Sequence, residues 1–340
     1  MTKLWQAPLT LRASIEKRPL THAFHITGYT FTESEVLVVY LQDGERVGRG
    51  EGLGVYYRND TPASMLKQIE ALHERIELGI TREQLQELLP AGGARNALDC
   101  ALWDLDAKRA GKAVWQLAGM PAPQPLLTTF TLSADEPEVM AENARQLSDA
   151  RALKLKLTND HRNAERVRAV RAARPSAWMM VDANQGFTRD SLQDALPAFV
   201  EAGVAVVEQP FPVGSENLLD GLNSPIPLAA DESVQDHRDL QKLVGRVQII
   251  NIKLDKCGGL TEALSMARMA RDLGFKVMVG NMGGSSWSMA PAFVLGSLCA
   301  VVDLDGPVYV RTDRTPGVSY RDGRIWCADE VWGGPVTATA

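Results

Sequence analysis

Five ionisable residues stand at regular intervals in the second half of the chain, each at the end of an apolar or alternating run. They are Lys156, Asp182, Glu208, Asp231 and Lys253, and successive members are 26, 26, 23 and 22 residues apart. Each interval has the length of one strand, one helix and two loops. A charged residue that recurs at the carboxyl ends of successive strand–helix units is typical of a (β/α)-barrel active site.

The carboxylates of Asp182, Glu208 and Asp231 follow three consecutive predicted strands. One such carboxylate alone would be explained more simply as a helix cap or as an acceptor of backbone N–H groups. Three carboxylates that meet in a dry barrel mouth repel each other unless a cation neutralises them. All-oxygen ligation favours Mg²⁺, which leaves coordination positions for substrate oxygens. We therefore predict one Mg²⁺ per subunit, held by these three residues.

Two lysines flank the predicted metal site. Lys156 and Lys253 end the second and the sixth strands, which lie opposite each other in a barrel of eight. A metal-bound substrate carboxylate would present its α-carbon between them, so that an α-proton leaves one face and returns to the other through an enediolate. Each lysine must be neutral to act as a base, and the metal, Lys154 and desolvation lower its pKa. The alternative for Lys253 is an ion pair with Asp255 or with a barrel carboxylate.

Eight strands with helical patterns between them are predicted after a linker marked by Pro121, Pro123 and Pro125. This alternation implies right-handed crossovers and a closed parallel barrel. An open doubly wound sheet is the alternative, but the first strand is not followed by a GxGxxG turn. The strands are predicted near 126–131, 152–157, 177–182, 204–208, 226–231, 247–254, 275–279 and 299–303.

The first part of the chain, residues 1–120, is predicted to form a separate α+β region. Strand patterns cover 35–41 and 48–52, and Thr61 with Pro62 begins a helix as its cap and its first residue. Further helices are predicted at 81–89 and, with an amphipathic pattern, at 94–110. Residues 121–312 are assigned to the barrel, and 313–340 to a segment that returns to the first region.

The composition argues against several classes of partner. The chain of 340 residues has a formal net charge of −6, whereas nucleic-acid partners usually require a basic face. Its first residues lack the apolar core of a signal peptide, and no apolar run is long enough to span a bilayer. The four cysteines form neither a CxxC pair nor a zinc-binding spacing. We expect a cytoplasmic protein with reduced thiols and without nucleic-acid or membrane partners.

Short motifs surround the ionisable residues, and together they carry a family resemblance. They are Lys154-x-Lys156, VDAN at 181–184, VEQP at 207–210, ADES at 230–233 and NIKLDKCGG at 251–259. In this order and spacing they resemble the muconate-lactonizing subgroup of the enolase superfamily, over nearly the whole chain. The resemblance implies a modified TIM-type (β/α)7β barrel with an α+β capping domain, formed by the N-terminal region and the C-terminal tail. It also assigns Lys156 to the (R) centre and Lys253 to the (S) centre of the substrate.

The end of the eighth predicted strand carries Asp303 and Asp305, which face the fourth strand across the mouth. An Asp-x-Asp here is similar to that of the dipeptide epimerases, in which it holds the free α-ammonium of the dipeptide. The alternative is a helix-capping pair. The resemblance thus implies a dipeptide that is epimerised at its C-terminal residue. The substrate-binding residues that we expect are Lys154, Thr131, Asp303, Asp305, Asp255, Gly283 and Ser285.

The substrate-covering loop at 24–31 departs from the family pattern. The epimerases specific for Ala-Glu carry an arginine there, and this loop has none. We therefore expect a preferred substrate other than L-Ala-L-Glu, with an apolar or mixed side chain under the aromatic loop. His25 and Tyr29 are the predicted loop contacts, and Arg58 is a further candidate to meet an acidic side chain.

Three alternatives remain open. Within the subgroup, the chain could be an N-acylamino-acid racemase or a muconate-type cycloisomerase, whose substrates would bring no ammonium to Asp303 and Asp305. The third is a non-catalytic homologue that binds a small carboxylate, against which the three carboxylates and two lysines argue. The resemblance also suggests a homo-oligomer.

Overall fold

A three-stranded antiparallel sheet begins the part of the chain that the computed structural model describes, which is residues 8–26 and 29–335, without the side chains of 24–26. Its strands β1 (Thr10–Ile26), β2 (Tyr29–Asp43) and β3 (Arg46–Gly52) are paired in chain order. The predicted strands at 35–41 and 48–52 are confirmed as parts of β2 and β3. The long β1 was not predicted as one strand, because Pro19 and charged residues interrupt its pattern. Pro19 is tolerated because β1 is an edge strand, and the register shifts after it.

Helices cover one side of this sheet and complete the capping domain. They are α1 (Pro62–Ala71), α2 (His73–Glu77), α3 (Arg82–Leu88) and α4 (Gly93–Ala110), preceded by the short η1 (Tyr56–Arg58). Thr61 and Thr81 form capping boxes at α1 and α3, which confirms both predicted helix starts. The chain then passes through α5 (Val114–Leu117) and the two-residue strand β4 (Leu126–Leu127) to the barrel.

Helix α4 is more deeply buried than its predicted amphipathic pattern suggested, because it lies between the sheet and the barrel. Fourteen of its 18 residues are buried. Gly48 and Gly50 of β3 allow it to approach the sheet. A Cβ at Gly50 would lie 1.9 Å from the carbonyl oxygen of Ala97, and one at Gly48 would lie 2.1 Å from that of Ala101. Glycine at these two positions is thus a packing requirement.

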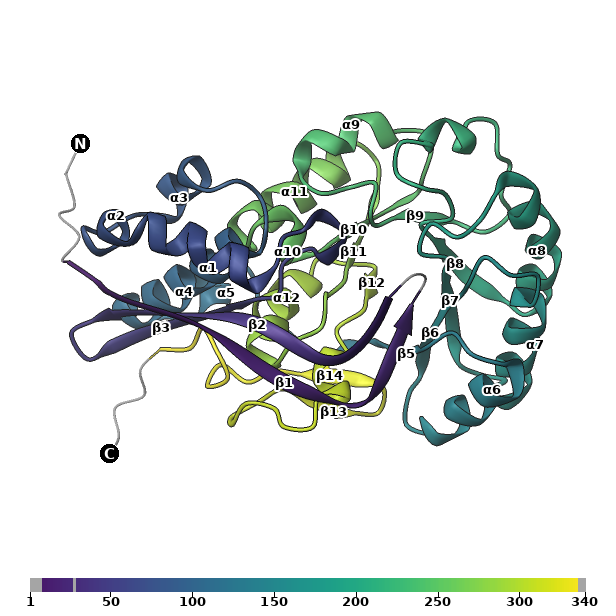
Figure 1. Cartoon of the computed structure of the whole chain (residues 1–340), viewed down its shortest axis with the longest axis horizontal. Helices are drawn as coiled ribbons and strands as arrows, with labels where there is room; N and C mark the ends of the chain where they lie inside the picture. Colours follow the sequence, from purple (N-terminus) through teal and green to yellow (C-terminus); the bar gives the residue numbers. More distant parts are fainter. Residues whose placement is uncertain (1–7, 27–28, 336–340) are drawn as a thin grey trace.

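The barrel consists of eight parallel strands, which confirms all eight predicted strands and the predicted fold class. In spatial order they run from β5 to β12 without interruption. The bounds are β5 (Thr129–Leu132), β6 (Ala152–Lys156), β7 (Trp178–Asp182), β8 (Val204–Glu208), β9 (Leu228–Ala230), β10 (Ile249–Ile252), β11 (Lys276–Val279) and β12 (Val301–Val302). Figure 1 shows this barrel beside the capping domain, with β1 and β2 extending from one to the other.

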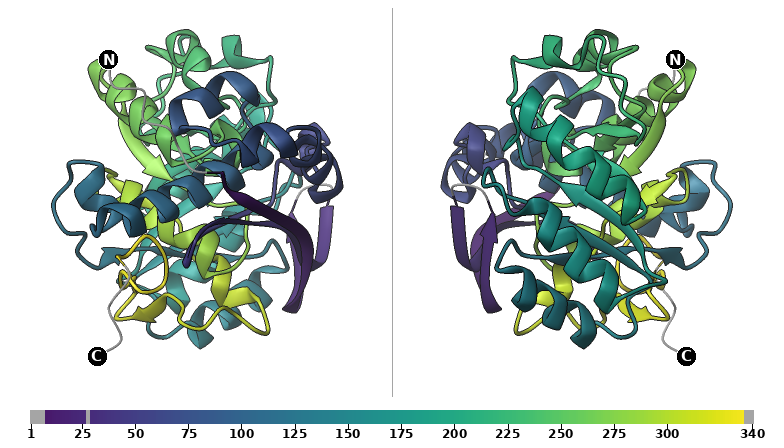
Figure 2. Two further views of the ribbon diagram at one scale, coloured as in Figure 1. Left: turned by 90° about the vertical axis from the view of Figure 1, so that its left-hand side faces the viewer. Right: turned by 90° about the vertical axis from the view of Figure 1, so that its right-hand side faces the viewer.

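Helices surround the barrel, and Figure 2 (right) shows several of them side by side on its outer face. They are α6 (Pro137–Gln146), α7 (Asn163–Ala173), α8 (Arg189–Glu201), η2 (Glu216–Leu219), η3 (His237–Asp239), α9 (Leu240–Leu243), α10 (Leu254–Cys257), α11 (Leu260–Asp272) and α12 (Ser286–Gly296). A small apolar cluster fills the inside of the barrel, formed by Met180, Val206, Ala229, Ile249 and Met278. Among the described residues, no helix is both long and apolar enough to cross a membrane.

The first and last barrel strands meet at a seam that side chains close. Thr129 Oγ1 donates to Asp303 Oδ1 at 2.6 Å, and the amide of Leu304 donates to Thr128 Oγ1 at 2.9 Å. The chain continues through η4 (Gly306–Tyr309) to β13 (Ser319–Arg321) and β14 (Arg324–Trp326), which form a small sheet with β4. The tail also reaches the capping domain, because Trp332 Nε1 donates to the carbonyl of Arg49 at 2.8 Å.

Candidate active site

Strand register brings the three predicted metal ligands together. Lys156 pairs with Asp182 across β6 and β7, and Asp182 pairs with Glu208 across β7 and β8. Asp231 follows β9 directly. Each of the three carboxylates offers an oxygen within 4.8 Å of the others, and all three residues are buried. The recurrence of charged residues at strand ends in the sequence therefore corresponds to one cluster in space.

The two predicted bases approach this cluster from opposite sides of the barrel. Lys156 Nζ lies 2.6 Å from Asp182 Oδ2, and Lys253 Nζ lies 2.6 Å from Asp231 Oδ2. Of the two ion pairs considered for Lys253, the structure forms the one with a barrel carboxylate. Asp255 points elsewhere.

Lys154 lies deeper in the barrel than either base. Its Nζ contacts Glu208 Oε2 at 2.7 Å, Asp182 Oδ2 at 3.0 Å and Asp303 Oδ2 at 2.9 Å. The long side chain thus crosses the mouth and joins the metal-site carboxylates to the eighth strand. Although Asp303 belongs to the eighth strand, Lys154 thus links it directly to the carboxylates of the predicted metal site.

Two polar residues of the cluster were not predicted as site residues. Lys256 Nζ donates to Asp231 Oδ1 at 2.5 Å and to its carbonyl at 2.6 Å. Asn251 Nδ2 donates to Glu208 Oε1 at 2.7 Å. The sequence did hold a signal for Asn251, which is the one strongly polar residue within the apolar run 249–252. Lys256 gave none, because a lysine that follows a strand end is usually solvated.

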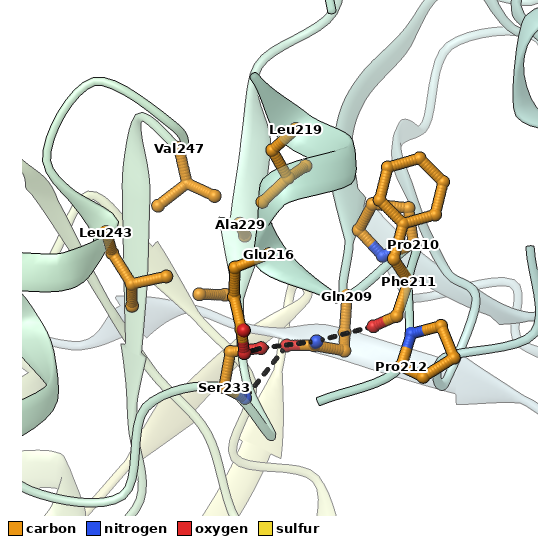
Figure 3. A pocket seen from close by; sticks show the side chains of 11 residues that line it. Gln209, Pro210, Phe211, Pro212, Glu216, Leu219, Ala229, Ser233, Leu243 and Val247 are labelled. Atoms are coloured by element: carbon orange, nitrogen blue, oxygen red, sulfur yellow. Dashed lines mark hydrogen bonds between the residues drawn. The ribbon is translucent and has the colours of Figure 1, made fainter. Parts of the chain in front are cut away.

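Gln209 was also missed, and it joins the ends of β8 and β9. Its Oε1 accepts from the amides of Asp231 and Ser233 at 2.9 and 3.1 Å. Its Nε2 donates to the carbonyl of Phe211 and to Ser233 Oγ, both at 2.8 Å. Figure 3 shows this amide between the two strand ends, with Ser233 bonded in turn to Glu216. The side chain adjacent to Glu208 therefore fixes the backbone that carries Asp231.

The charges of the cluster are strongly interdependent. Burial opposes ionisation of Asp182, but Lys154 and Lys156 outweigh it and lower the pKa of Asp182 to about 2. Burial and the charge of Asp182 raise the pKa of Glu208 to about 7. Burial favours the neutral amine of Lys253, yet Asp231 raises the pKa of this lysine above its usual value. The carboxylate of Asp231 thus favours the ammonium form of Lys253.

The donor set fits a hard divalent cation. The three carboxylates converge within one cluster and are neutralised in the structure only by lysines, as far as the described residues show. Next to them, the buried oxygens Asn184 Oδ1 and Glu232 Oε2 have no hydrogen-bond partner among the described residues. Oxygen ligands without soft donors suit Mg²⁺. Asp182, Glu208 and Asp231 are therefore the residues that would hold the ion.

A cavity of about 470 Å³ lies between the two domains, and Lys253 is the member of this cluster that lines it. The barrel contributes Lys253, Thr131, Asp303, Asp305 and Gly283 to its wall. The capping domain contributes Phe31, Ser34, Leu53, Gly54 and Tyr56. Ser34 was not predicted, and its buried hydroxyl has no hydrogen-bond partner among the described residues. The volume is sufficient for a small peptide-sized ligand.

The two aspartates of the eighth strand line the cavity and also close the barrel seam. Asp303 is bonded to Thr129 and Lys154. Asp305 Oδ2 accepts from the amide of Thr131 at 2.7 Å and from the hydroxyl of Tyr309 at 3.2 Å. Burial, followed by the charge of Asp303, raises the pKa of Asp305 to about 6. Neither residue caps a regular α-helix.

Three predicted substrate contacts lie outside the cavity wall, namely Lys154, Asp255 and Ser285. Asp255 accepts hydrogen bonds from the capping domain, and Ser285 is bonded to Glu51. Gly283 lines the cavity as expected. Tyr29 stacks against Phe31 at 6.1 Å between ring centroids, Arg58 is exposed, and the side chain of His25 lies outside the described residues.

Comparisons with known proteins agree with this geometry. Residues 139–330 match the family model of enolase C-terminal domain-like proteins. Residues 10–119 match the model of the mandelate racemase / muconate lactonizing enzyme N-terminal domain.

Individual relatives extend over nearly the whole chain. The L-Ala-D/L-Glu epimerase of Escherichia coli (strain K12) is 38% identical, over 93% of this chain and 99% of its own length. The N-acetyl-D-glutamate racemase of a Pseudoalteromonas species is 40% identical, over 88% of this chain and 95% of its own. A crystal structure from Agrobacterium tumefaciens, of an enolase family member with homology to dipeptide epimerases and with bound sodium and L-Ala-L-Glu, has a TM-score of 0.92. It is 39% identical and covers 96% of this chain and 100% of its own. The chain therefore belongs to the enolase superfamily, within its mandelate racemase / muconate lactonizing enzyme family.

Proposed function

We propose that this protein is a Mg²⁺-dependent dipeptide epimerase that inverts the α-carbon of the C-terminal residue by 1,1-proton transfer. The observation that carries the proposal is the position of Lys156 and Lys253 on opposite sides of one buried carboxylate cluster, with Lys253 lining the interdomain cavity. A single planar carbon between two amines can lose a proton to one and gain a proton from the other.

The residues of this chain have distinct roles in the proposed reaction. Asp182, Glu208 and Asp231 hold the ion, which when bound stabilises the negative charge that develops on the substrate carboxylate. Lys156 and Lys253 exchange the α-proton, each from its own side. Burial of the cluster excludes bulk water and thereby strengthens these electrostatic interactions.

The far end of the cavity suits a free α-ammonium. Asp303 and Asp305 line it, and Thr129, Thr131 and Lys154 orient their carboxylates. A substrate that brings an ammonium would therefore meet two acceptors whose positions are already fixed. Thr131 and Gly283 stand beside them as candidate contacts to the peptide backbone.

The second candidate function is racemisation of an N-acylamino acid. It is favoured by the similarity to the N-acetyl-D-glutamate racemase. It is also favoured because the carboxylates of Asp303 and Asp305 already accept hydrogen bonds at the barrel seam. Asp303 accepts from Thr129 and Lys154, and Asp305 accepts from Thr131. These aspartates thus have a structural role that requires no substrate ammonium.

One experiment separates the two candidates. The purified protein with Mg²⁺ is incubated in D₂O with a dipeptide library and with N-acetylated amino acids, and deuterium uptake is followed by mass spectrometry. Uptake into free-amine dipeptides supports the epimerase, and uptake confined to N-acyl amino acids supports the racemase. The preference for a residue other than glutamate stays a prediction, as do the domain boundaries, the cytoplasmic location and the homo-oligomeric state.

A further inference from the structure

Two buried carboxylates reach across the domain interface in opposite directions. Asp255 belongs to the barrel, two residues after Lys253, and its Oδ1 accepts from the amides of Leu53 and Gly54 in the capping domain at 2.8 and 3.2 Å. Asn96 of α4 donates to the same oxygen at 3.1 Å. The loop at 53–54, which lines the cavity, is thus fastened to the segment that carries Lys253.

Glu51 makes the reciprocal connection from the capping domain to the barrel. It is fully buried in β3. Its Oε1 accepts from the amide of Ser285 and from Ser288 Oγ, both at 2.7 Å, and its Oε2 accepts from Ser285 Oγ at 2.5 Å. Arg314 Nη2 donates to Oε2 at 2.9 Å and compensates the buried charge. Glu51 therefore holds the start of α12, directly after the cavity-lining Gly283 and Gly284.

Between these two carboxylates, the side chain of Leu53 packs on the glycine pair. A Cβ at Gly284 would lie 2.7 Å from Leu53 Cδ1 and 2.9 Å from Glu51 Oε1. One at Gly283 would lie 3.4 Å from Leu53 Cδ2. Both glycines have positive φ, +105° and +98°, which favours glycine independently of the space. One wall of the cavity is therefore a close contact between the two domains.

We infer that Glu51 and Asp255 form a reciprocal clasp that positions the Leu53–Gly284 wall, and that this wall determines how tightly the substrate binds. Neither carboxylate lines the cavity, so both are positioning residues and not catalytic ones. Loosening the clasp should weaken substrate binding and leave the metal site and the two lysines in place. This inference uses the proposed epimerase activity for its kinetic readout.

The chain offers matched variants. Asp255→Ala removes the acceptor, whereas Asp255→Asn retains an oxygen that can accept from both amides. Asp99 serves as the control, because it is also a fully buried carboxylate between the domains. It accepts from the amide and hydroxyl of Thr261 at 2.9 and 2.6 Å, away from the cavity wall. Asp99→Ala therefore loses a comparable interdomain contact without touching the loop at 53–54.

The test measures kcat and KM for the best dipeptide, together with Mg²⁺ affinity and hydrogen–deuterium exchange of the peptide that contains Leu53 and Gly54. Asp255→Ala should raise KM by about tenfold, the equivalent of one hydrogen bond to a charged group, with little change in kcat or Mg²⁺ affinity. Leu53→Ala should raise KM in the same way. Exchange at 53–54 should accelerate in Asp255→Ala only, and Asp255→Asn should resemble the wild type.

Two results would overturn the clasp. One is an unchanged KM in Asp255→Ala despite faster exchange at 53–54. The other is an equal rise of KM in Asp99→Ala, which would make the effect one of general domain loosening. Failure of the proposed function would look different, because the wild type itself would then turn over no dipeptide. The same KM and exchange comparison would in that case be made with the N-acyl amino acid that is turned over.

Discussion

Lys154 donates to Asp303 across the barrel mouth, with 2.9 Å between Nζ and Oδ2. The same ammonium contacts Glu208 Oε2 at 2.7 Å. One lysine therefore connects the predicted metal site with the predicted ammonium site, and its hydrogen bond orients the carboxylate of Asp303. The two sites that would bind the two ends of the substrate belong to one hydrogen-bonded network. The distance between these two sites is therefore fixed before the substrate binds.

The first prediction concerns the substrate amine. Free-amine dipeptides should react and their N-acetylated forms should not, because acetylation removes the charge that Asp303 and Asp305 would bind. Loss of such a buried charged contact costs roughly 2–5 kcal/mol. Comparison of kcat/KM for matched pairs, with and without the acetyl group, measures this cost. An N-acyl amino acid that outcompetes every dipeptide would establish the racemase instead.

The second prediction concerns the metal. Asp231→Asn should abolish activity and weaken Mg²⁺ binding by more than about tenfold, because it removes one of three ligand charges. Isothermal titration calorimetry with Mg²⁺ and circular dichroism of the variant provide the measurements, and the fold should be retained. Full activity of the wild type in excess chelator would contradict the metal-site assignment.

The third prediction concerns Gln209, whose amide ties Asp231 to the end of β8. Gln209→Glu replaces a donor by a carboxylate oxygen that faces the carbonyl of Phe211. Mn²⁺ affinity, measured by electron paramagnetic resonance without substrate, should fall by about tenfold. Gln248→Ala is the control, because Gln248 also bonds β9, at the amide of Leu228, but at the opposite end of the strand. Equal losses in both variants would show that Gln209 acts on stability alone.

The fourth prediction concerns the close approach of α4 to the capping sheet. Gly50→Ala should lower the free energy of unfolding by about 1–3 kcal/mol, because its Cβ would overlap the backbone of Ala97. Gly44→Ala is the comparison: its Cβ meets nothing within 4 Å, and only its positive φ of 58° opposes a side chain. Urea unfolding of both variants measures the difference, and an equal cost would mean that the steric argument at Gly50 is incorrect.

The barrel and its cluster of ionisable residues at the strand ends could be predicted from the sequence because local patterns determine them. Strand length and period position Lys156, Asp182 and Glu208, and the register then places them side by side. The contacts between the domains could not be predicted in this way. Asp255 was expected at the substrate, yet its carboxylate accepts from the amides of Leu53 and Gly54, about 200 residues earlier in the chain. No periodicity encodes such a pairing.

The hydrogen-bond partners of the side chains in the cluster could likewise not be predicted from the sequence. Lys256 neither begins nor ends a strand, so its position in the sequence did not mark it as a site residue. Only the structure shows that its ammonium group forms an ion pair with Asp231. Gln209 stood within a recognised motif, but its role depends on an amide that bridges two strand ends. Ser285 was expected at the substrate, and it caps α12 under Glu51 instead.

The central claim is that Lys156 and Lys253 serve opposite faces of one α-carbon, and proton NMR of single variants in D₂O tests it most directly. Lys156→Ala and Lys253→Ala should both fail to epimerise, because neither can deliver a proton to both faces. Each should still exchange the α-proton of one diastereomer, Lys156→Ala that of the L,L-dipeptide and Lys253→Ala that of the L,D-dipeptide. If either variant epimerises at a near wild-type rate, or if both exchange the same diastereomer, the two-base mechanism is contradicted.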